Sequence, residues 1–481
     1  MKAENRGTQT DQNQDSKQSQ TQQIQTQQIQ TQQEQTQRRY QPSGSFKRVL
    51  RNKPFLLLWL AQLISQIGFN AANYGIIVIV TEITRSTVMV GIAIISFTLP
   101  AIPFSVLAGA YVDYLDKRLI LWVCNALRAI TTVLIVVALL WNRTAVIPLY
   151  LLSFLMSLIT QFFTPAESST IPLLVGRRDV MPALSLFSIT LTVGQALGFL
   201  LLGQLITLLV PPFNLNFGMG VIPVHPVDLL FFIIAIGYII CMGLILAIPA
   251  HALQYEGERK EWIPRSFVEQ IRRIVKHDVR ESWHLVRQDH ILFLALMRAS
   301  LVSVLLLVIG ELAGPFVQNV LHLPANDLSL IFAPAGVALV LGGIAMPHLT
   351  GFIGKDRTIT IGTFATAIGL VLLPLGEFIS ATLVSHLASI IYVAAISFVV
   401  GLSLDLINIP AQTYLQERTP ENERGRVFAF ESMLYNSGSI PVILFAGLVA
   451  DTVGIQMVMY MIAVALLAFQ WWATRYARQR A

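Results

Sequence analysis

Residues 109–141 read GAYVDYLDKRLILWVCNALRAITTVLIVVALLW, a charged turn that leads directly into a long apolar stretch. An α-helix rises 1.5 Å per residue, so about 20 apolar residues cross the roughly 30 Å hydrocarbon core of a bilayer. The stretch 119–141 is long enough to do so and holds a single charge, Arg128. It is therefore predicted to span a membrane, with the charged turn at its water-facing end.

The composition of the whole chain agrees with this prediction. Of its 481 residues, 54% are hydrophobic and only 12% are charged, whereas soluble domains carry about 25% charged residues. The net charge of +6 comes from short basic clusters between apolar runs, a pattern typical of membrane-protein loops. The sequence has no basic stripe with interleaved aromatic residues, so a nucleic-acid partner is not expected.

The same length criterion predicts twelve spans and hence an all-α integral membrane protein. The predicted spans cover residues 55–80, 87–112, 119–141, 146–174, 182–210, 227–249, 291–318, 327–349, 358–376, 386–414, 427–449 and 454–474. The longest hydrophilic interruption divides these spans six and six.

Lysine and arginine residues predict the orientation. With the N-terminus placed inside, the inner segments hold 26 basic residues and the outer loops hold only Arg85 and Arg143. Because basic loops favour the cytoplasmic side, both termini are predicted to be cytoplasmic. The expected location is the inner (plasma) membrane, with multiple passes.

Four segments follow from this division. They are a Gln-rich cytoplasmic tail (1–45), an N-terminal six-helix bundle (46–250), a cytoplasmic amphipathic linker (251–290) and a C-terminal six-helix bundle (291–481). The tail is too polar to bury a core and is interpreted as disordered. A receptor or scaffold that acts through this tail is one hypothesis for the function, and it requires the tail.

Signals for catalysis and cofactors are lacking in the sequence. It contains no H-E-x-x-H, G-x-S-x-G or G-x-x-x-x-G-K-[ST] motif, so neither an enzyme nor direct ATP drive is expected. Cys124 and Cys241 lie in apolar runs and are interpreted as buried hydrophobes. No metal and no cofactor are predicted.

An internal repeat relates the two halves. Phe163-Thr164-Pro165-Ala166-Glu167 near the end of the fourth span resembles Asn408-Ile409-Pro410-Ala411-Gln412 near the end of the tenth. A basic inner turn and another span follow each copy. This matching position is expected of duplicated, pseudosymmetric six-helix bundles.

The charged turn between spans two and three resembles a family signature. Gly109, Asp113, Lys117 and Arg118 fit the pattern G-x-x-x-D-x-x-x-[RK]-[RK] of the major facilitator superfamily at that loop. The segments 163–186 and 413–430 are similar to the branch that contains macrolide-efflux and enterobactin-exporter proteins. The resemblance covers about residues 45–475. It implies two bundles rocking about a central site, with export of a substrate against proton entry.

The resemblance also implies a cytoplasmic gate. Asp113 is expected to act as a latch against the N-terminal end of span eleven, near Gly425 and Arg426. Lys117 and Arg118 would orient or gate the bundles. The alternative is that the basic pair only anchors the loop at the inner surface.

Charges inside the spans are the candidates for translocation or coupling, since each costs about 2.5–3.5 kcal/mol to insert unless it has a partner or a wet cavity. They are Arg128, Glu167, Arg298, Glu311 and Asp405. Arg128 and Glu167 lie at similar depth and could pair between adjacent helices, either as a structural ion pair or as a substrate or proton site. Glu311, near Gly314 and Pro315 where the helix is expected to break, suits a protonatable gate or a solvated interface position.

Two sets of polar residues share helix faces. Asp405 and Asn408 lie at i and i+3 in span ten, and they either bond between helices or contact substrate. In span one, Gln62, Gln66, Asn70 and Asn73 form a polar stripe. The stripe is predicted to line a cavity, with interhelical hydrogen bonding as the alternative. Gly194 and Gly198 in span five favour close helix packing.

The sequence thus predicts a secondary transporter, interpreted as a monomeric proton-coupled exporter of small amphipathic compounds such as drugs or siderophore-like metabolites. Its expected partners are this small-molecule substrate, protons and the lipid bilayer. An importer or uniporter of a small solute is the alternative within the same class.

Overall fold

The computed structural model describes most of the chain. The described ranges are 46–112, 115–176, 179–198, 213–216, 221–253, 279–322, 328–377, 386–420 and 423–480. The predicted tail, 1–45, and most of the predicted linker, 254–278, lie outside them.

Helices dominate the first half of the described chain. The elements are α2 (Phe46–Arg51), α3 (Lys53–Thr84), α4 (Thr87–Thr98), α5 (Ala101–Val112), α6 (Lys117–Trp141), α7 (Val146–Leu174), α8 (Val180–Leu197), β1 (Phe213–Asn216), β2 (Val221–Val224), α10 (Pro226–Leu246) and η2 (Ala250–Leu253). The strands β1 and β2 form an antiparallel hairpin with Phe213 opposite Val224. This short hairpin lies between α8 and α10, and the predicted all-α class stands.

The second half repeats the arrangement. Its elements are α12 (Val279–Gln288), α13 (His290–Pro315), η4 (Phe316–Val320), α14 (Leu328–Ile353), α15 (Lys355–Leu372), α17 (His386–Arg418), α18 (Arg424–Thr452) and α19 (Ile455–Arg480). Pro165 in α7 and Pro410 in α17, the prolines of the internal repeat, both lie inside their helices.

Polar caps start several of these helices. The Asp116 carboxylate accepts a 2.8 Å hydrogen bond from the Arg118 backbone N–H at the start of α6. Asp289 does the same for Ile291 at the start of α13, also at 2.8 Å. Such caps satisfy backbone donors that have no partner within the helix, so they help to define where α6 and α13 begin.

Two predicted details need correction. The second span was expected to be one helix over 87–112, but α4 ends at Thr98 and α5 begins at Ala101. Pro100 and Pro103 explain this break because proline lacks the N–H that a continuous helix needs. At Pro315 the chain does not break but widens into the π-helical turn η4.

Nine of the described helical stretches are long and apolar enough to cross a membrane. Three predicted spans, 182–210, 327–349 and 358–376, coincide with α8, α14 and α15, which do not meet that criterion in their described residues. The chain is thus a multi-pass membrane protein, and the count of twelve spans stays a prediction.

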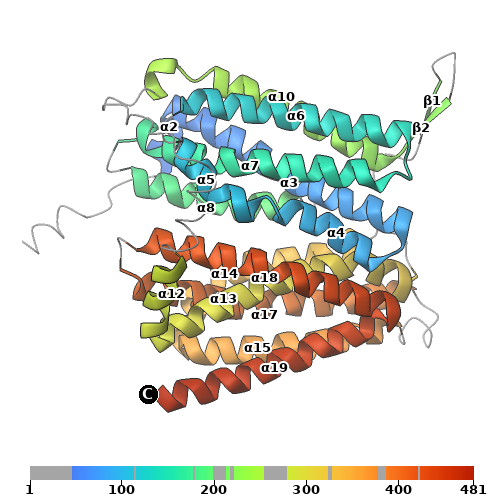
Figure 1. Cartoon of the computed structure of the whole chain (residues 1–481), viewed down its shortest axis with the longest axis vertical. Coiled ribbons are helices and arrows are strands. Elements are labelled where there is room, and N and C mark those ends of the chain that lie inside the picture. The colour runs from blue at the N-terminus through green and yellow to red at the C-terminus, as the bar shows by residue number, and fades with distance from the viewer. Residues whose placement is uncertain are drawn as a thin grey trace, which may run out of the picture.

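The helices form two groups that lie side by side (Figure 1). The N-terminal group holds α3 to α8 and α10, and the C-terminal group holds α13 to α19. The hairpin β1–β2 projects at one end of the molecule, here called the hairpin end. Helices α2 and α12 and the C-terminus lie at the opposite end, here called the termini end.

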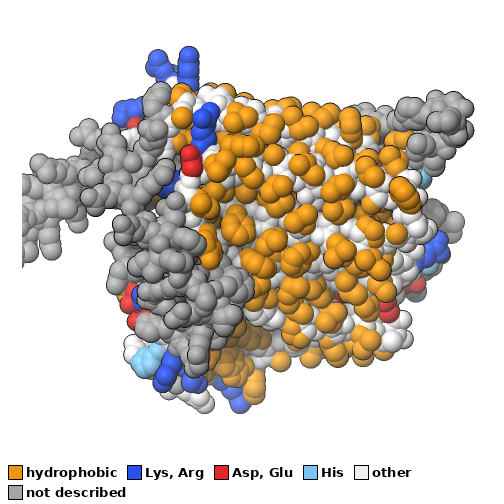
Figure 2. All heavy atoms as spheres, turned by 45° about the horizontal axis from the view of Figure 1, so that its top comes forward, with side chains coloured by type: hydrophobic (Ala, Val, Ile, Leu, Met, Phe, Trp, Pro, Cys, Tyr) orange, Lys and Arg blue, Asp and Glu red, His pale blue; other side chains and the backbone are white. Residues whose placement is uncertain are grey.

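On the face shown in Figure 2, apolar side chains form a broad belt, with the visible charges towards the two ends. Many large apolar side chains are exposed, and Ile130 and Val137 on α6 and Phe364 and Ile368 on α15 are each about half exposed. Water would not favour so large an apolar surface, whereas lipid does not penalise it. The belt therefore agrees with a position inside a bilayer.

Candidate functional site

Glu311 lies where the two helix groups meet near the hairpin end. Its side chain is fully buried, and it projects from α13 towards Gly91 on α4 and Gly447 on α18. A Cβ atom on Gly91 would lie 2.5 Å from Glu311 Oε1, and one on Gly447 would lie 2.6 Å from the same oxygen. Among the described residues, neither carboxyl oxygen has a hydrogen-bond partner.

The two groups are also joined at the rim next to this site. Asp451, at the end of α18, accepts hydrogen bonds from Ser86 Oγ at 2.6 Å and from the Thr87 backbone N–H at 2.7 Å. A third hydrogen bond comes from the Val88 N–H at 3.2 Å. A carboxylate from the C-terminal group therefore caps a helix of the N-terminal group.

A further contact closes the hairpin end. Gly314 on α13 packs against Thr81 on α3, so closely that a Cβ on the glycine would collide with the threonine hydroxyl. Thr81 bonds back to the Ile77 carbonyl of its own helix at 2.7 Å. With the contacts between α4 and α18, these residues hold the hairpin ends of both groups together.

Arg128 sits inside the N-terminal group and is 2% exposed. Its guanidinium donates to Ser65 Oγ at 2.7 Å and to Thr160 Oγ1 at 3.0 Å. It also lies over the Phe163 ring, 4.3 Å from the centroid, a favourable cation–π geometry.

Glu167 is buried in the same helix group but makes no ion pair with Arg128 among the described residues. Its Oε1 atom has no hydrogen-bond partner there. The direct pair considered from the sequence is thus replaced by hydroxyl and aromatic partners for the arginine, and equal depth along two helices was too weak a reason to expect contact.

The polar stripe of α3 meets α8. A Cβ on Gly194 would lie 2.7 Å from Gln66 Cγ, and one on Gly198 would lie 2.6 Å from Asn70 Cβ. These glycines therefore bring the two helices together, as predicted. The amides of Asn70 and Asn73 donate to backbone carbonyls one turn earlier, while Gln66 and Asn73 remain half-buried.

In the C-terminal group the predicted charges lie apart from Glu311. Arg298 pairs with Asp356 at 3.7 Å, at the start of α15. Asp405 packs on α14, where a Cβ on Gly342 would lie 2.5 Å from its Oδ2 atom. Asp405 Oδ2 and Asn408 Oδ1 are buried and have no hydrogen-bond partner among the described residues.

The predicted gate at the termini end is described only in part. Asp113 lies outside the described residues, and Gly109 and Gly425 are described for their backbones, in α5 and α18. Arg118 donates to the Leu246 carbonyl at 2.6 Å, which ties α6 to the end of α10 within one helix group.

Two further basic residues of this predicted gate have different surroundings. Arg426 pairs with Glu281 of α12 at 3.1 Å. Lys117 begins α6 directly after the Asp116 cap. The pair of Arg426 with Glu281 links α18 to α12 in the second half of the chain and does not reach the N-terminal group. The gating role of Lys117 and Arg426 stays a prediction.

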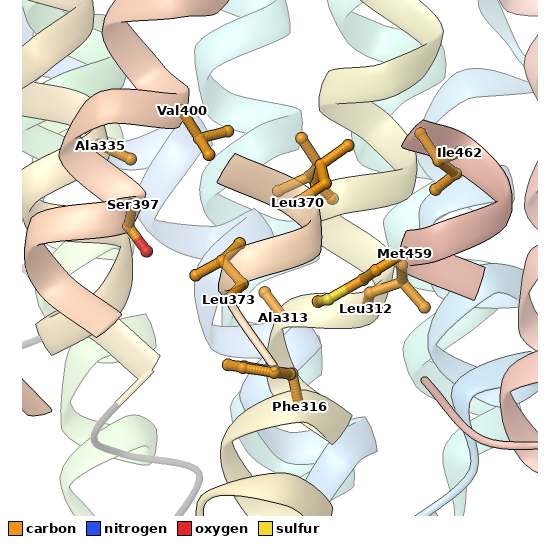
Figure 3. A pocket seen from close by; sticks show the side chains of 11 residues that line it. Leu312, Ala313, Phe316, Ala335, Leu370, Leu373, Ser397, Val400, Met459 and Ile462 are labelled. Atoms are coloured by element: carbon orange, nitrogen blue, oxygen red, sulfur yellow. The ribbon is translucent and has the colours of Figure 1, made fainter. Parts of the chain in front are cut away.

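A small apolar pocket lies within the C-terminal group (Figure 3). Side chains from α13, η4, α14, α15, α17 and α19 line it, among them Leu312, Phe316, Leu370, Val400 and Met459. Ser397 supplies the one hydroxyl of its lining. None of the predicted site residues lines it, so it is an apolar space inside one helix group.

Three acidic residues with buried or inter-helix contacts were not among the candidates predicted from the sequence. Asp228 binds Arg143 through both carboxyl oxygens at 3.0 Å. Glu431 is buried in α18 and accepts a 2.6 Å hydrogen bond from Gln412. Asp451 lies just past the predicted end of span eleven. Glu431 carries the clearest missed signal, because it is a charge inside a predicted span. Ser86-Thr87 before an apolar run is also a typical helix start.

Among the residues that the structure describes, no three His, Cys, Asp or Glu side chains gather into a group that could hold a metal ion. The described residues provide buried carboxyl groups without an ion-pair partner among them, such as Glu311 and Asp405, and a junction between two helix groups.

Two proteins of Bacillus subtilis (strain 168) are similar to the chain in sequence, and both are named uncharacterized MFS-type transporters. YfiS is 22% identical over 418 residues, which cover 85% of this chain and 90% of YfiS. YkuC is 27% identical over 156 residues, which cover 31% of this chain and 36% of YkuC.

Solved transporter structures share the fold. The nucleoside transporter NupG matches with a TM-score of 0.62 and 14% identity, over 87% of this chain and 98% of NupG. A bacterial homologue of the iron transporter ferroportin, in an inward-facing state, matches with a TM-score of 0.65 and 14% identity, over 89% of this chain and 99% of the homologue. A peptide transporter POT in complex with sulfate matches with a TM-score of 0.65 and 10% identity, over 91% of this chain and 99% of the peptide transporter.

Identities this low show the fold alone, but the sequence pattern of the Major Facilitator Superfamily matches residues 58–443 of the chain. That match covers most of both helix groups and confirms the predicted family. The chain therefore belongs to the Major Facilitator Superfamily and is a membrane transporter rather than an enzyme.

Proposed function

We propose that this transporter is proton-coupled and that Glu311 carries the coupling proton. The supporting observation is the position of its carboxyl group, which is buried between Gly91 and Gly447 from opposite helix groups without a hydrogen-bond donor among the described residues. Burying a bare carboxylate costs far more than burying a neutral acid. The carboxyl group of Glu311 would therefore have to be protonated when the two helix groups close around it. When the groups open and water reaches it, Glu311 could lose this proton.

The proposed topology places the hairpin end outside the cell. The length of the apolar stretches supports twelve spans, and the excess of basic residues in the predicted inner loops supports both termini in the cytoplasm. The proposed location is the plasma membrane. In this orientation the contacts that hold α4 to α18 and α3 to α13 would seal the outer side. A single chain would contain the complete transport path.

The proposed substrate is a small amphipathic compound, and the proposed direction is export. The half-buried amides Gln66 and Asn73 share α3 with Phe69, whose ring meets Phe97 of α4 edge to face at 6.2 Å. A surface with amide and aromatic groups side by side suits a ligand that has polar and apolar faces. The resemblance to exporters in segments 163–186 and 413–430 supports the direction.

The test is transport of a panel of fluorescent amphipathic compounds into and out of liposomes that contain the purified protein. A pH gradient of either sign is imposed, and wild type is compared with Glu311→Gln. Export coupled to protons predicts accumulation only when proton flow opposes substrate flow, and loss of this accumulation in the variant. Glu377→Gln is the matched control, because Glu377 is an exposed carboxylate whose hydrogen-bond partner among the described residues, Gln456, belongs to the same C-terminal group.

Each alternative has its own result in this assay. Accumulation in the same direction as proton flow would establish an importer. Equilibration of substrate without any response to the pH gradient would establish a uniporter. Full activity of the chain after deletion of residues 1–45 would exclude a receptor or scaffold that depends on the tail.

A further inference from the structure

The junction at the hairpin end contains a second acidic residue, Asp451, that differs from Glu311 in its exposure and in its hydrogen-bond partners. Glu311 is buried and has no hydrogen-bond partner in the described chain, whereas Asp451 lies at the exposed rim and accepts three hydrogen bonds. All three donors belong to Ser86, Thr87 and Val88, the cap and first turn of α4. The partners are more than 360 residues away in sequence.

The chemistry of this contact is that of a helix N-cap supplied from another helix group. The first backbone N–H groups of a helix have no partner within the helix and carry the positive end of its dipole. Asp451 satisfies two of them with one carboxylate, and charge-assisted hydrogen bonds of this kind are stronger than neutral ones. Separation of the helix groups exposes these donors to water, so the contact favours the closed arrangement without making it permanent.

The same two helices form the pocket around Glu311. Gly447 lies one turn before Asp451 on α18, and a Cβ there would lie 3.0 Å from the Val88 Cα atom. Gly91 lies one turn after Thr87 on α4. Asp451 therefore fixes the first turn of α4 against α18 at the register that leaves Glu311 between two glycines.

We infer that Asp451 is the latch of the hairpin end: its carboxylate holds the first turn of α4 to α18, and release of this contact opens the glycine-lined pocket of Glu311 to water. The latch is a positioning device that acts through helix contacts. It stands whether or not Glu311 carries a coupling proton.

The experiment measures the opening of the hairpin end directly. Spin labels are placed on Trp141→Cys and Leu375→Cys, one in each helix group, and the distance between them is measured by pulsed electron spin resonance. Both native side chains are exposed, and the native cysteines Cys124 and Cys241 are buried. Wild type is compared with Asp451→Ala and Asp451→Asn.

The expected result is a shift of the distance distribution towards longer distances, with the open population raised about tenfold in Asp451→Ala and less in Asp451→Asn, which still accepts a hydrogen bond. Ser86→Ala removes one donor and should give a smaller shift in the same direction. Glu377→Gln, the rim carboxylate that bonds within one group, should match wild type.

A second readout follows the Glu311 pocket. Modification of Glu311 by a water-soluble carbodiimide, located by mass spectrometry, should be several-fold faster in Asp451→Ala than in wild type or Glu377→Gln. The inference is overturned if both Asp451 variants elute as folded monodisperse protein but keep the wild-type distances and labelling rate. If Asp451→Ala does not fold, Asp451→Asn and Ser86→Ala decide the question, because both keep the size of the contact nearly unchanged.

Discussion

Glu311 occupies the space above Gly91, across the junction of the two helix groups: a Cβ atom on this glycine would lie 2.5 Å from Glu311 Oε1 and 2.9 Å from Ile443 Cγ2. Both distances are too short for a real side chain. Gly91→Ala is therefore expected to disfavour the closed hairpin end. Overpacking typically costs about 1–3 kcal/mol, which corresponds to a loss of about 5- to 150-fold in the population of the closed state. Transport rates in liposomes measure this loss.

Gly310→Ala provides the matched control. Gly310 is the neighbour of Glu311 on α13, and a Cβ there would meet nothing within 4 Å. This variant should transport at the wild-type rate, while Gly447→Ala, which would contact Glu311 at 2.6 Å, should behave like Gly91→Ala. Equal activity of all three variants would contradict a tight closed junction.

Arg128 and Glu167 should differ in their contributions to stability. Arg128 holds Ser65 and Thr160 and lies on the Phe163 ring, so Arg128→Ala removes several contacts at once. It should lower the free energy of unfolding by about 2–4 kcal/mol. Glu167→Gln leaves these contacts of Arg128 in place and should cost only about 1 kcal/mol. Denaturant titration in detergent micelles measures both.

A direct ion pair between Arg128 and Glu167, as considered from the sequence, would give a different result. If Glu167 were the direct partner of Arg128, its removal would leave a buried arginine without a counter-charge, and the two single variants would be equally unstable. A double-mutant cycle distinguishes the cases, since a direct ion pair gives a coupling energy well above the error of about 0.5 kcal/mol.

Much of the helix layout could be predicted from the sequence because it depends on local properties. Apolar length predicts α6 and α7 to within a few residues, since each helix satisfies its own backbone groups in lipid. Close helix packing at α8 was likewise predictable, because Gly194 and Gly198 are spaced by one turn and present no side chain, although the sequence did not identify α3 as the neighbour. Pro100 explains a break that apolar length alone does not reveal.

The partners of the buried charges could not be predicted in the same way. Asp451 meets Ser86 only because α18 and α4 are neighbours in the folded protein, although the two residues are 365 positions apart. Hydropathy ends span eleven before Asp451 and therefore assigns this residue to a solvated loop. Arg128 has hydroxyl partners that any of several helices could supply. The position of a residue along its span predicts how deep its side chain lies in the membrane, but it does not predict which other side chains it contacts.

His225 should make stability depend on pH. It precedes α10 at the hairpin end, where burial lowers its pKa, and the nearby Arg143 lowers it further while Asp228 acts in the opposite direction. The unfolded chain therefore binds more protons than the folded one below about pH 6.5, so stability should fall as the pH drops through that range. His225→Gln should weaken this dependence, as measured by thermal unfolding between pH 5 and 7.5.

The control for this prediction is His348→Gln. His348 is exposed on α14, and its replacement should leave the wild-type pH dependence in place. An unchanged profile in His225→Gln would show that other groups account for the acid sensitivity.

The clearest functional prediction separates exchange from net transport at Glu311. Glu311→Gln keeps the shape of the side chain and remains neutral, so the helix groups can still close around it in the pocket between Gly91 and Gly447. Substrate exchange across liposomes with equal pH on both sides should therefore continue at a rate within about threefold of wild type. Accumulation driven by a pH gradient should be lost, because glutamine cannot bind or release a proton.

A purely structural role for Glu311 predicts a different pattern. In that case the neutral glutamine would leave both exchange and gradient-driven accumulation intact, or it would impair both equally through misfolding. Glu311→Asp helps to decide, because it restores a titratable group on a shorter side chain: recovery of even part of the gradient-driven accumulation would tie coupling to the proton, and recovery of exchange alone would not.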